Sequence, residues 1–155
     1  MSDKAKGWIF VFVQFSLLLI IMFSSAIEFK QMTRAFSPVV HYIGVTLILI
    51  GTLLFTFTII NFGQMVTPNP VPRDKATLRT TGIYRLIRHP MYFSILVMFL
   101  GITLYFQAYY SFLWIAVLFV FFLVKSSAEE KFMSNKFPEY NQYKTTSKRI
   151  IPFIY

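Results

Sequence analysis

The sequence lacks cysteine altogether and has few charged residues. Charged residues make up 14% of its 155 residues, against roughly 25% in a soluble domain. The absence of cysteine excludes a disulfide framework, a thiolate nucleophile and any cysteine-ligated zinc or iron–sulfur site. The scarcity of charge, together with a hydrophobic content of 56% and an aromatic content of 19%, indicates a chain that is solvated by lipid.

Acidic residues are scarce too, and the common nucleotide and hydrolase motifs are missing. Lys and Arg number 15 against 6 Asp and Glu, which gives a formal net charge of +9. Because basic residues collect beside apolar spans in membrane proteins, this excess predicts no nucleic-acid partner. The sequence has no G-x-S-x-G, P-loop or G-x-G-x-x-G motif, and His41 and His89 do not have the spacing of metal ligands. Hydrolase, nucleotide-triphosphate, Rossmann-type and metal-dependent chemistries therefore lack support.

Four apolar stretches predict an all-α integral membrane helical bundle that forms a single domain. The first stretch has about 21 uncharged residues, or roughly 30 Å of helix, which matches the hydrocarbon core of a bilayer. Gly44 and Gly51 share one face of the second stretch, which predicts close packing against another helix. Residues 89–124 carry no charged side chain and are long enough for two short spans joined by a turn near 107–111. The predicted spans are 7–27, 39–62, 90–106 and 110–128, with a loop at 63–89 and a final segment at 129–155.

The basic residues are distributed unevenly over the predicted loops. With four spans, the amino terminus, the loop at 63–89 and the segment at 129–155 lie on one side of the membrane. Only Lys30 and Arg34 lie on the other side. The positive-inside rule then predicts that both termini are cytoplasmic, in the inner or plasma membrane if the chain is prokaryotic. The basic residues on the cytoplasmic side are Lys4, Lys6, Arg73, Lys75, Arg79, Arg85, Arg88, Lys125, Lys131, Lys136, Lys144, Lys148 and Arg149.

The loop before the third span contains the first candidate site. It opens at 67–72 with three prolines, which favour a stiff, extended path. Pro90 suits the first turn of a helix, which leaves His89 near the helix cap and directs unpaired backbone N–H groups toward the cytoplasmic side. With Arg85 and Arg88 beside it, this corner is predicted to bind a carboxylate. A structural alternative has equal weight: the arginines hold lipid phosphates, and the histidine only caps the helix.

The adjacent carboxylates of Glu129 and Glu130 form the second candidate site. Neighbouring carboxylates repel each other, and here they stand close to a membrane surface that is often anionic. Lys125 and Lys131 offer a structural explanation, as ordinary pairs on the surface of a helix. The functional interpretation depends on the two glutamates facing the same side of the membrane as His89.

Several short strings in the second half of the chain follow one another in a specific order. They are Thr81-Gly82-Ile83-Tyr84-Arg85, Arg88-His89-Pro90-Met91-Tyr92, Gly101, Glu129-Glu130, Phe137-Pro138-Glu139-Tyr140, Tyr143, Lys148-Arg149 and Pro152. This order resembles the isoprenylcysteine carboxyl methyltransferase and phospholipid methyltransferase superfamily over roughly 72–152. The spans at 7–27 and 39–62 match that superfamily only as generic hydrophobic helices.

The resemblance implies S-adenosylmethionine as the methyl donor, bound at the cytoplasmic end of the last helices and covered by the carboxyl-terminal segment. A basic corner opposite an acidic pair fits the opposite charges of that molecule. The implied cofactor-binding residues are Arg88, His89, Pro90 and Tyr92 on one wall, Glu129 and Glu130 on the other, and Tyr84, Gly101, Tyr140 and Tyr143. Where the family often has glycine, this chain has Ser94, so helix packing against the cofactor is expected to differ.

Methyl transfer from a sulfonium is a direct displacement, which needs an aligned nucleophile more than an acid or a base. The implied function is a membrane methyltransferase of the isoprenylcysteine carboxyl methyltransferase type that acts on a small or lipidic acceptor. Arg149 and Arg85 are candidates for positioning an anionic acceptor. A phospholipid amine and a thiol are alternative acceptors within the superfamily. Alternatives from other classes are an NADPH-dependent relative of the sterol and enone reductases, and a non-catalytic scaffold that binds membrane lipids.

Overall fold

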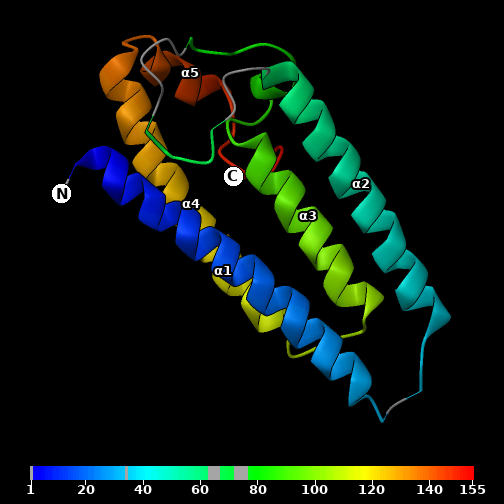
Figure 1. Cartoon of the computed structure of the whole chain (residues 1–155). Helices are drawn as coiled ribbons and strands as arrows, with labels where there is room; N and C mark the ends of the chain where they lie inside the picture. Colours follow the sequence, from blue (N-terminus) through cyan, green and yellow to red (C-terminus); the bar gives the residue numbers. More distant parts are fainter. Residues whose placement is uncertain (1, 34, 63–66, 72–76) are drawn as a thin grey trace.

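The computed structural model describes residues 2–33, 35–62, 67–71 and 77–155, and their regular structure is helical. The order along the chain can be followed by colour in Figure 1. The elements are α1 (Asp3–Lys30), α2 (Pro38–Phe62), the 3-10 helix η2 (Gly82–Arg85), α3 (Pro90–Tyr105), α4 (Phe112–Lys136) and α5 (Tyr140–Thr146). This architecture confirms the predicted all-α membrane bundle. Four residues named for the loops, Arg34, Pro72, Arg73 and Lys75, lie outside the described residues.

Among the described helices, three are long and apolar enough to cross a membrane: α1, α2 and α4. The fourth apolar helix, α3, has 16 residues and a length of about 24 Å, which is shorter than a hydrocarbon core of roughly 30 Å. In Figure 1, α3 starts further inside the bundle than the ends of α2 and α4. The loop that precedes α3 therefore enters the bundle between longer helices.

The local sequence explains where several helices begin and end. The hydroxyl of Ser2 accepts a hydrogen bond from the backbone N–H of Ala5 at 3.3 Å and so caps α1. Prolines begin α2 at Pro38 and α3 at Pro90, where the missing N–H costs no helical hydrogen bond. Helix α4 ends directly before Phe137 and Pro138, because a residue that precedes proline is disfavoured in helical conformation.

Glycines bring α2 and α3 into direct backbone contact. A Cβ atom on Gly44 would lie 2.4 Å from the backbone nitrogen of Tyr105, and one on Gly51 would lie 2.6 Å from that of Met98. From the other side, a Cβ on Gly101 would lie 2.7 Å from the backbone nitrogen of Ile48. The predicted packing face of Gly44 and Gly51 is thus the face that holds α3, as small residues do between helices in lipid.

Helices α1 and α4 pack together and against α3, on the side of α3 away from α2 (Figure 1). Their shared core contains the fully buried side chains of Ile21, Leu118 and Phe122, together with Phe99 from α3. Helix α3 is therefore the central helix: it contacts α2 through glycines and the other two helices through large apolar side chains.

The end of the bundle away from the N-terminus is tied together by polar side chains. The carboxylate of Glu28 accepts hydrogen bonds from the Ser111 hydroxyl at 2.5 Å and from the Tyr110 backbone N–H at 3.0 Å. The Gln107 amide bonds the backbone N–H and carbonyl of Ser37 at 3.1 and 2.9 Å. These contacts fix the α3–α4 turn to the ends of α1 and α2, and leave the opposite end for the candidate site.

Candidate active site

The loop before α3 is held by the segment that follows α5. The backbone N–H of Arg88 donates to the carbonyl of Lys148 at 2.8 Å, and that of His89 donates to the carbonyl of Arg149 at 3.0 Å. The N–H of Lys148 returns a bond to the Leu86 carbonyl at 2.9 Å, as part of an isolated parallel bridge. Two segments about 60 residues apart thus share backbone hydrogen bonds, which orients the side chains of Arg88 and His89.

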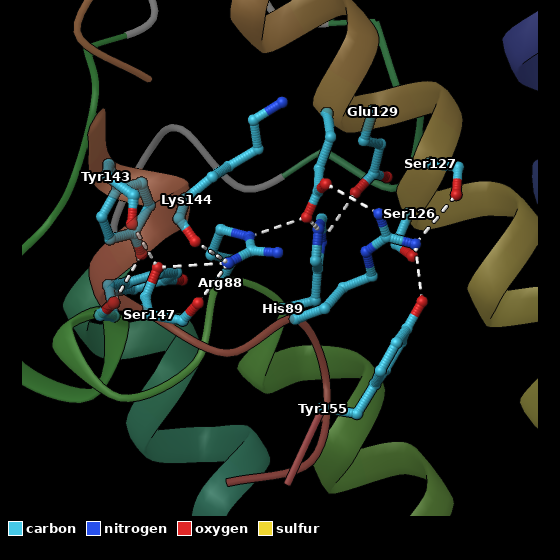
Figure 2. A network of polar contacts seen from close by, with 12 residues as sticks. Arg88, His89, Ser126, Ser127, Glu129, Tyr143, Lys144, Ser147 and Tyr155 are labelled. Atoms are coloured by element: carbon cyan, nitrogen blue, oxygen red, sulfur yellow. Dashed lines mark hydrogen bonds and ion pairs between the residues drawn. The ribbon is translucent and has the colours of Figure 1, made fainter. Parts of the chain in front are cut away.

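The guanidinium of Arg88 is buried and joins three parts of the chain. Its Nε lies 2.7 Å from Oε1 of Glu130, in an ion pair in which both side chains are less than a tenth exposed. Its Nη1 donates to the carbonyls of Lys144, at 3.2 Å, and Ser147. Figure 2 shows Arg88 between α4 and the end of α5, close to His89. The predicted meeting of the basic corner and the acidic pair is present in the structure.

Glu130 forms ion pairs with basic side chains of the loop before α3 and of the final segment. Besides Arg88, its carboxylate lies 3.4 Å from Nε2 of His89 and 3.1 Å from Nη2 of Arg149. Arg149 also donates to the hydroxyls of Ser127, at 3.0 Å, and Tyr155, at 3.1 Å. Because a buried carboxylate is costly unless it is paired, these contacts explain how Glu130 can be 4% exposed.

Glu129 has different partners from its neighbour. Its carboxylate lies 3.2 Å from Nδ1 of His89 and accepts a hydrogen bond from the hydroxyl of Tyr92. The rings of His89 and Tyr92 are stacked, with centroids 5.4 Å apart and planes within 6°. The two ring nitrogens of His89 therefore face two different carboxylates, and the imidazole bridges the adjacent glutamates.

The charge on His89 follows from these contacts. Burial disfavours the imidazolium, but hydrogen bonds and charge interactions with Glu129 and Glu130 outweigh burial and raise the pKa of His89 above its usual 6.5. The protonated ring donates from both nitrogens, which suits a position between two carboxylates. The ion pairs of the two glutamates within the described chain are with Arg88, His89 and Arg149, and not with Lys125 or Lys131.

Three buried tyrosines form the aromatic side of the site. Tyr84 from η2 packs with Tyr140 and Tyr143 from α5, and the Tyr143 hydroxyl donates to the Tyr84 carbonyl at 2.5 Å. Burial raises the pKa of Tyr143 to about 12 and also raises the pKa values of the other two. All three phenols are therefore neutral near neutral pH and offer flat faces and hydroxyl donors.

A cavity of about 340 Å³ lies among these groups, within the range of small-molecule sites. Its polar wall includes Arg88, His89 and Glu129, and apolar side chains of α1 and α2 line the same cavity. The predicted site residues that line the cavity are Tyr84, Arg88, His89, Pro90, Tyr92, Glu129, Tyr140 and Tyr143.

Four of the predicted site residues do not line the cavity. Glu130 is next to the cavity wall and holds Arg88 and His89 in place. Arg149 is bonded to Glu130 from the side of the final segment. Arg85 is exposed on η2 and does not line the cavity. Gly101 also does not line it, because it lies in the α2–α3 interface, where a side chain would collide with Ile48.

The position occupied by serine in place of the family glycine is compatible with tight packing. The Ser94 side chain is fully buried, and its hydroxyl donates to the carbonyl of Pro90 at 2.6 Å within the first turns of α3. This bond satisfies the hydroxyl inside its own helix. Ser94 does not line the cavity.

Lys125 and Gln14 line the cavity as well, and neither was among the site residues predicted from the sequence. The ammonium of Lys125 donates to the Gln14 side-chain oxygen at 2.6 Å and to the carbonyl of Pro68 at 2.9 Å. A signal was available in the sequence, since Gln14 is an uncharged polar residue inside an apolar span. The contact itself joins three segments that are distant along the chain, and spacing does not reveal it.

The comparisons with known proteins agree with this geometry. The phospholipid methyltransferase family model matches residues 39–140, which is more than half of the chain and includes η2, α3 and α4. No curated protein and no solved structure gives a significant match. The matched range contains Arg88, His89, Glu129 and Glu130, the residues that carried the resemblance noted in the sequence. The chain belongs to the phospholipid methyltransferase family.

Proposed function

We propose that this membrane methyltransferase takes a methyl group from S-adenosylmethionine bound in the cavity and transfers it to the amine of a phospholipid. The observation that carries the proposal is the cavity lining, in which Arg88, His89 and Glu129 lie together with three buried tyrosines. The family match supports methyl transfer and favours a phospholipid over the prenylated carboxylate or thiol that the sequence also allowed.

The residues present fit the polar parts of the donor. Arg88 uses Nε and Nη1 for the protein, and its Nη2 has no hydrogen-bond partner among the described residues, so it remains available for a carboxylate. The Glu129 carboxylate suits an ammonium or a ribose diol. The faces of Tyr84 and Tyr140 suit a purine. Opposite charges close together in the lining of a small cavity favour a zwitterion over a singly charged ligand.

The apolar side chains that line the cavity support a lipidic acceptor. Phe15 of α1, together with Phe55 and Ile59 of α2, lines the same cavity as the polar groups. Phe15 is 54% exposed and Ile59 is 37% exposed, on helices that are apolar enough to lie in lipid. An acyl chain can therefore contact these side chains while its headgroup reaches the polar wall.

The donor, when bound, supplies an activated methyl group on a sulfonium. The contribution of the chain is alignment and exclusion of water, which are the main requirements of a direct displacement. The ion pairs with Glu130 hold Arg88 and His89, and the hydrogen bond from the Tyr92 hydroxyl holds the Glu129 carboxylate. An amine acceptor must lose a proton before it can attack, and a carboxylate or a water at the polar wall can accept it.

Binding of the product analogue S-adenosylhomocysteine to the purified protein in detergent tests the proposal. We expect calorimetric binding to the wild type, and Glu129→Gln to weaken it by roughly tenfold, as loss of one charged hydrogen-bonding partner does. The matched control is Glu139→Gln, because Glu139 is an exposed acidic residue that does not line the cavity.

Transfer is then measured as methyl incorporation into phosphatidylethanolamine in detergent micelles. Binding of NADPH without S-adenosylhomocysteine would favour the reductase alternative. Binding of neither would favour the lipid-binding scaffold. Methylation of a prenylated cysteine in preference to the phospholipid would correct the acceptor and leave the donor assignment intact.

A further inference from the structure

Lys125 is a buried cation that the donor site does not use. Its side chain belongs to α4, one helical turn before Glu129, and the residue is 1% exposed. A lysine near the end of an apolar helix normally extends its ammonium toward the membrane surface. Here the ammonium turns into the bundle and contacts Gln14 of α1 and the loop at Pro68.

The partners of this ammonium are neutral. Gln14 and Pro68 each offer a carbonyl oxygen, at 2.6 and 2.9 Å, and the ring centroid of Tyr92 lies 5.3 Å from Nζ. Within the described part of the chain, no carboxylate lies within 4.0 Å of Nζ. Glu129 is near enough to interact electrostatically, but its oxygens are already engaged by His89 and Tyr92.

A buried ammonium has three donors and a large cost of desolvation, which neutral oxygens offset only in part. Because two N–H groups are held by Gln14 and Pro68, one remains at the cavity wall. An anionic oxygen that entered the cavity would accept a hydrogen bond from this third N–H group and compensate the positive charge of the ammonium.

The position of Lys125 along α4 indicates which kind of anion the cavity suits. Helix α4 runs from the far end of the bundle to the site, so Lys125 lies deeper than Glu129 by about one turn, roughly 5.4 Å. Phe15 directly follows Gln14 in α1, and Ile95 lies more than one turn beyond His89 in α3, so these two apolar lining side chains lie on the interior side of the polar wall. From the interior outward the cavity thus presents apolar groups, one cation, and then the polar wall.

A phospholipid with an amine headgroup has the same order: acyl chains, an anionic phosphate, and then an amine separated from the phosphate by two carbons. We propose that Lys125, held by Gln14, binds the phosphate of the acceptor phospholipid. The amine then lies about one helical turn further along, on the side of Glu129 and Tyr92, where the donor pocket is. This inference rests on the proposed function and adds a residue that selects phosphate-bearing acceptors.

The test compares two amine acceptors that differ in phosphate. Phosphatidylethanolamine carries phosphate, and a long-chain primary amine does not. Lys125→Met removes the charge at similar length, Lys125→Arg keeps it, and Lys131→Met is the control on the exposed face of the same helix. We expect Lys125→Met to raise the apparent KM for phosphatidylethanolamine by at least about tenfold, as loss of a buried charge partner does. The KM for the long-chain amine and the affinity for S-adenosylhomocysteine should stay within about twofold of wild type, and Lys125→Arg should retain most of the phosphate preference.

The outcomes separate this inference from the function on which it rests. Equal losses with both amines would assign Lys125 a purely structural role, and lost binding of S-adenosylhomocysteine would assign it to the donor; either result overturns the inference. Retention of phosphatidylethanolamine by the purified protein, measured by native mass spectrometry, needs no donor. If Lys125→Met retains the lipid as well as wild type does, the phosphate assignment is wrong, whatever the methyl donor proves to be.

Discussion

The Arg88 guanidinium and the Glu130 carboxylate form a buried ion pair, Nε to Oε1 at 2.7 Å, which links the loop before α3 to helix α4. Arg149 approaches the other oxygen of the same carboxylate at 3.1 Å. One acidic side chain thus fixes two basic segments that are separated by most of the carboxyl-terminal half of the chain. Glu129 is left facing the cavity.

Removal of this carboxylate should destabilise the fold strongly. Glu130→Gln leaves two guanidinium groups with an uncharged partner, and breaking a buried pair in this way costs about 3–5 kcal/mol. Thermal unfolding in detergent should show a clearly lowered Tm. The exposed Glu139→Gln should unfold at nearly the wild-type temperature. A Glu130→Gln protein as stable as wild type would show that the ion pairs contribute little to holding the loop.

The stability of the site should depend on pH through His89. The folded state raises the pKa of His89 above 6.5, so protonation stabilises the fold. This contribution is fully present below about pH 6.5, the unfolded-state value, and is lost as pH rises through the folded-state pKa. The difference in Tm between wild type and His89→Gln should therefore be largest near pH 6 and narrow toward alkaline pH. A difference that widens with pH would mean that the imidazole is neutral in the folded protein.

The orientation in the membrane can be tested cleanly because the chain has no native cysteine. Single cysteines at the exposed positions Ser2, Asn135 and Thr33 each provide one labelling site. From the distribution of basic residues, we expect a membrane-impermeant maleimide to reach Ser2→Cys and Asn135→Cys from the cytoplasmic side, and Thr33→Cys from the opposite side. Labelling of Ser2→Cys and Asn135→Cys from opposite sides would contradict the proposed placement of both termini.

Much of the fold could be predicted because lipid imposes simple requirements on sequence. The uncharged run at 89–124 and the tight turn within it predicted two helices, and α3 and α4 occupy that run. The packing face of Gly44 and Gly51 was predictable because only small side chains allow the backbone approach seen against α3.

The residues of the site could be predicted from the sequence, but the different contacts that each of them makes could not. Sequence motifs identified both glutamates, but their separate partners depend on rotation about α4, so that Glu129 lines the cavity and Glu130 lies beside it. The sequence offered Lys125 as the structural alternative, a surface partner of Glu129 four residues away on a helix. Its actual partners, Gln14 and Pro68, come from segments distant along the chain, and no local sequence pattern predicts these contacts.

The backbone pairing of Arg88 and His89 with Lys148 and Arg149 has a consequence for biosynthesis. Ribosomes deliver the chain from its amino terminus, so α1, α2, α3 and α4 are synthesised before the residues that pair with the loop before α3. Until residues 147–149 emerge, the two N–H groups before α3 have no acceptor and Glu130 has no Arg149. We expect a chain that stops before Ser147 to form its apolar helices and yet to lack the backbone acceptors and the Arg149 ion pair that order the site.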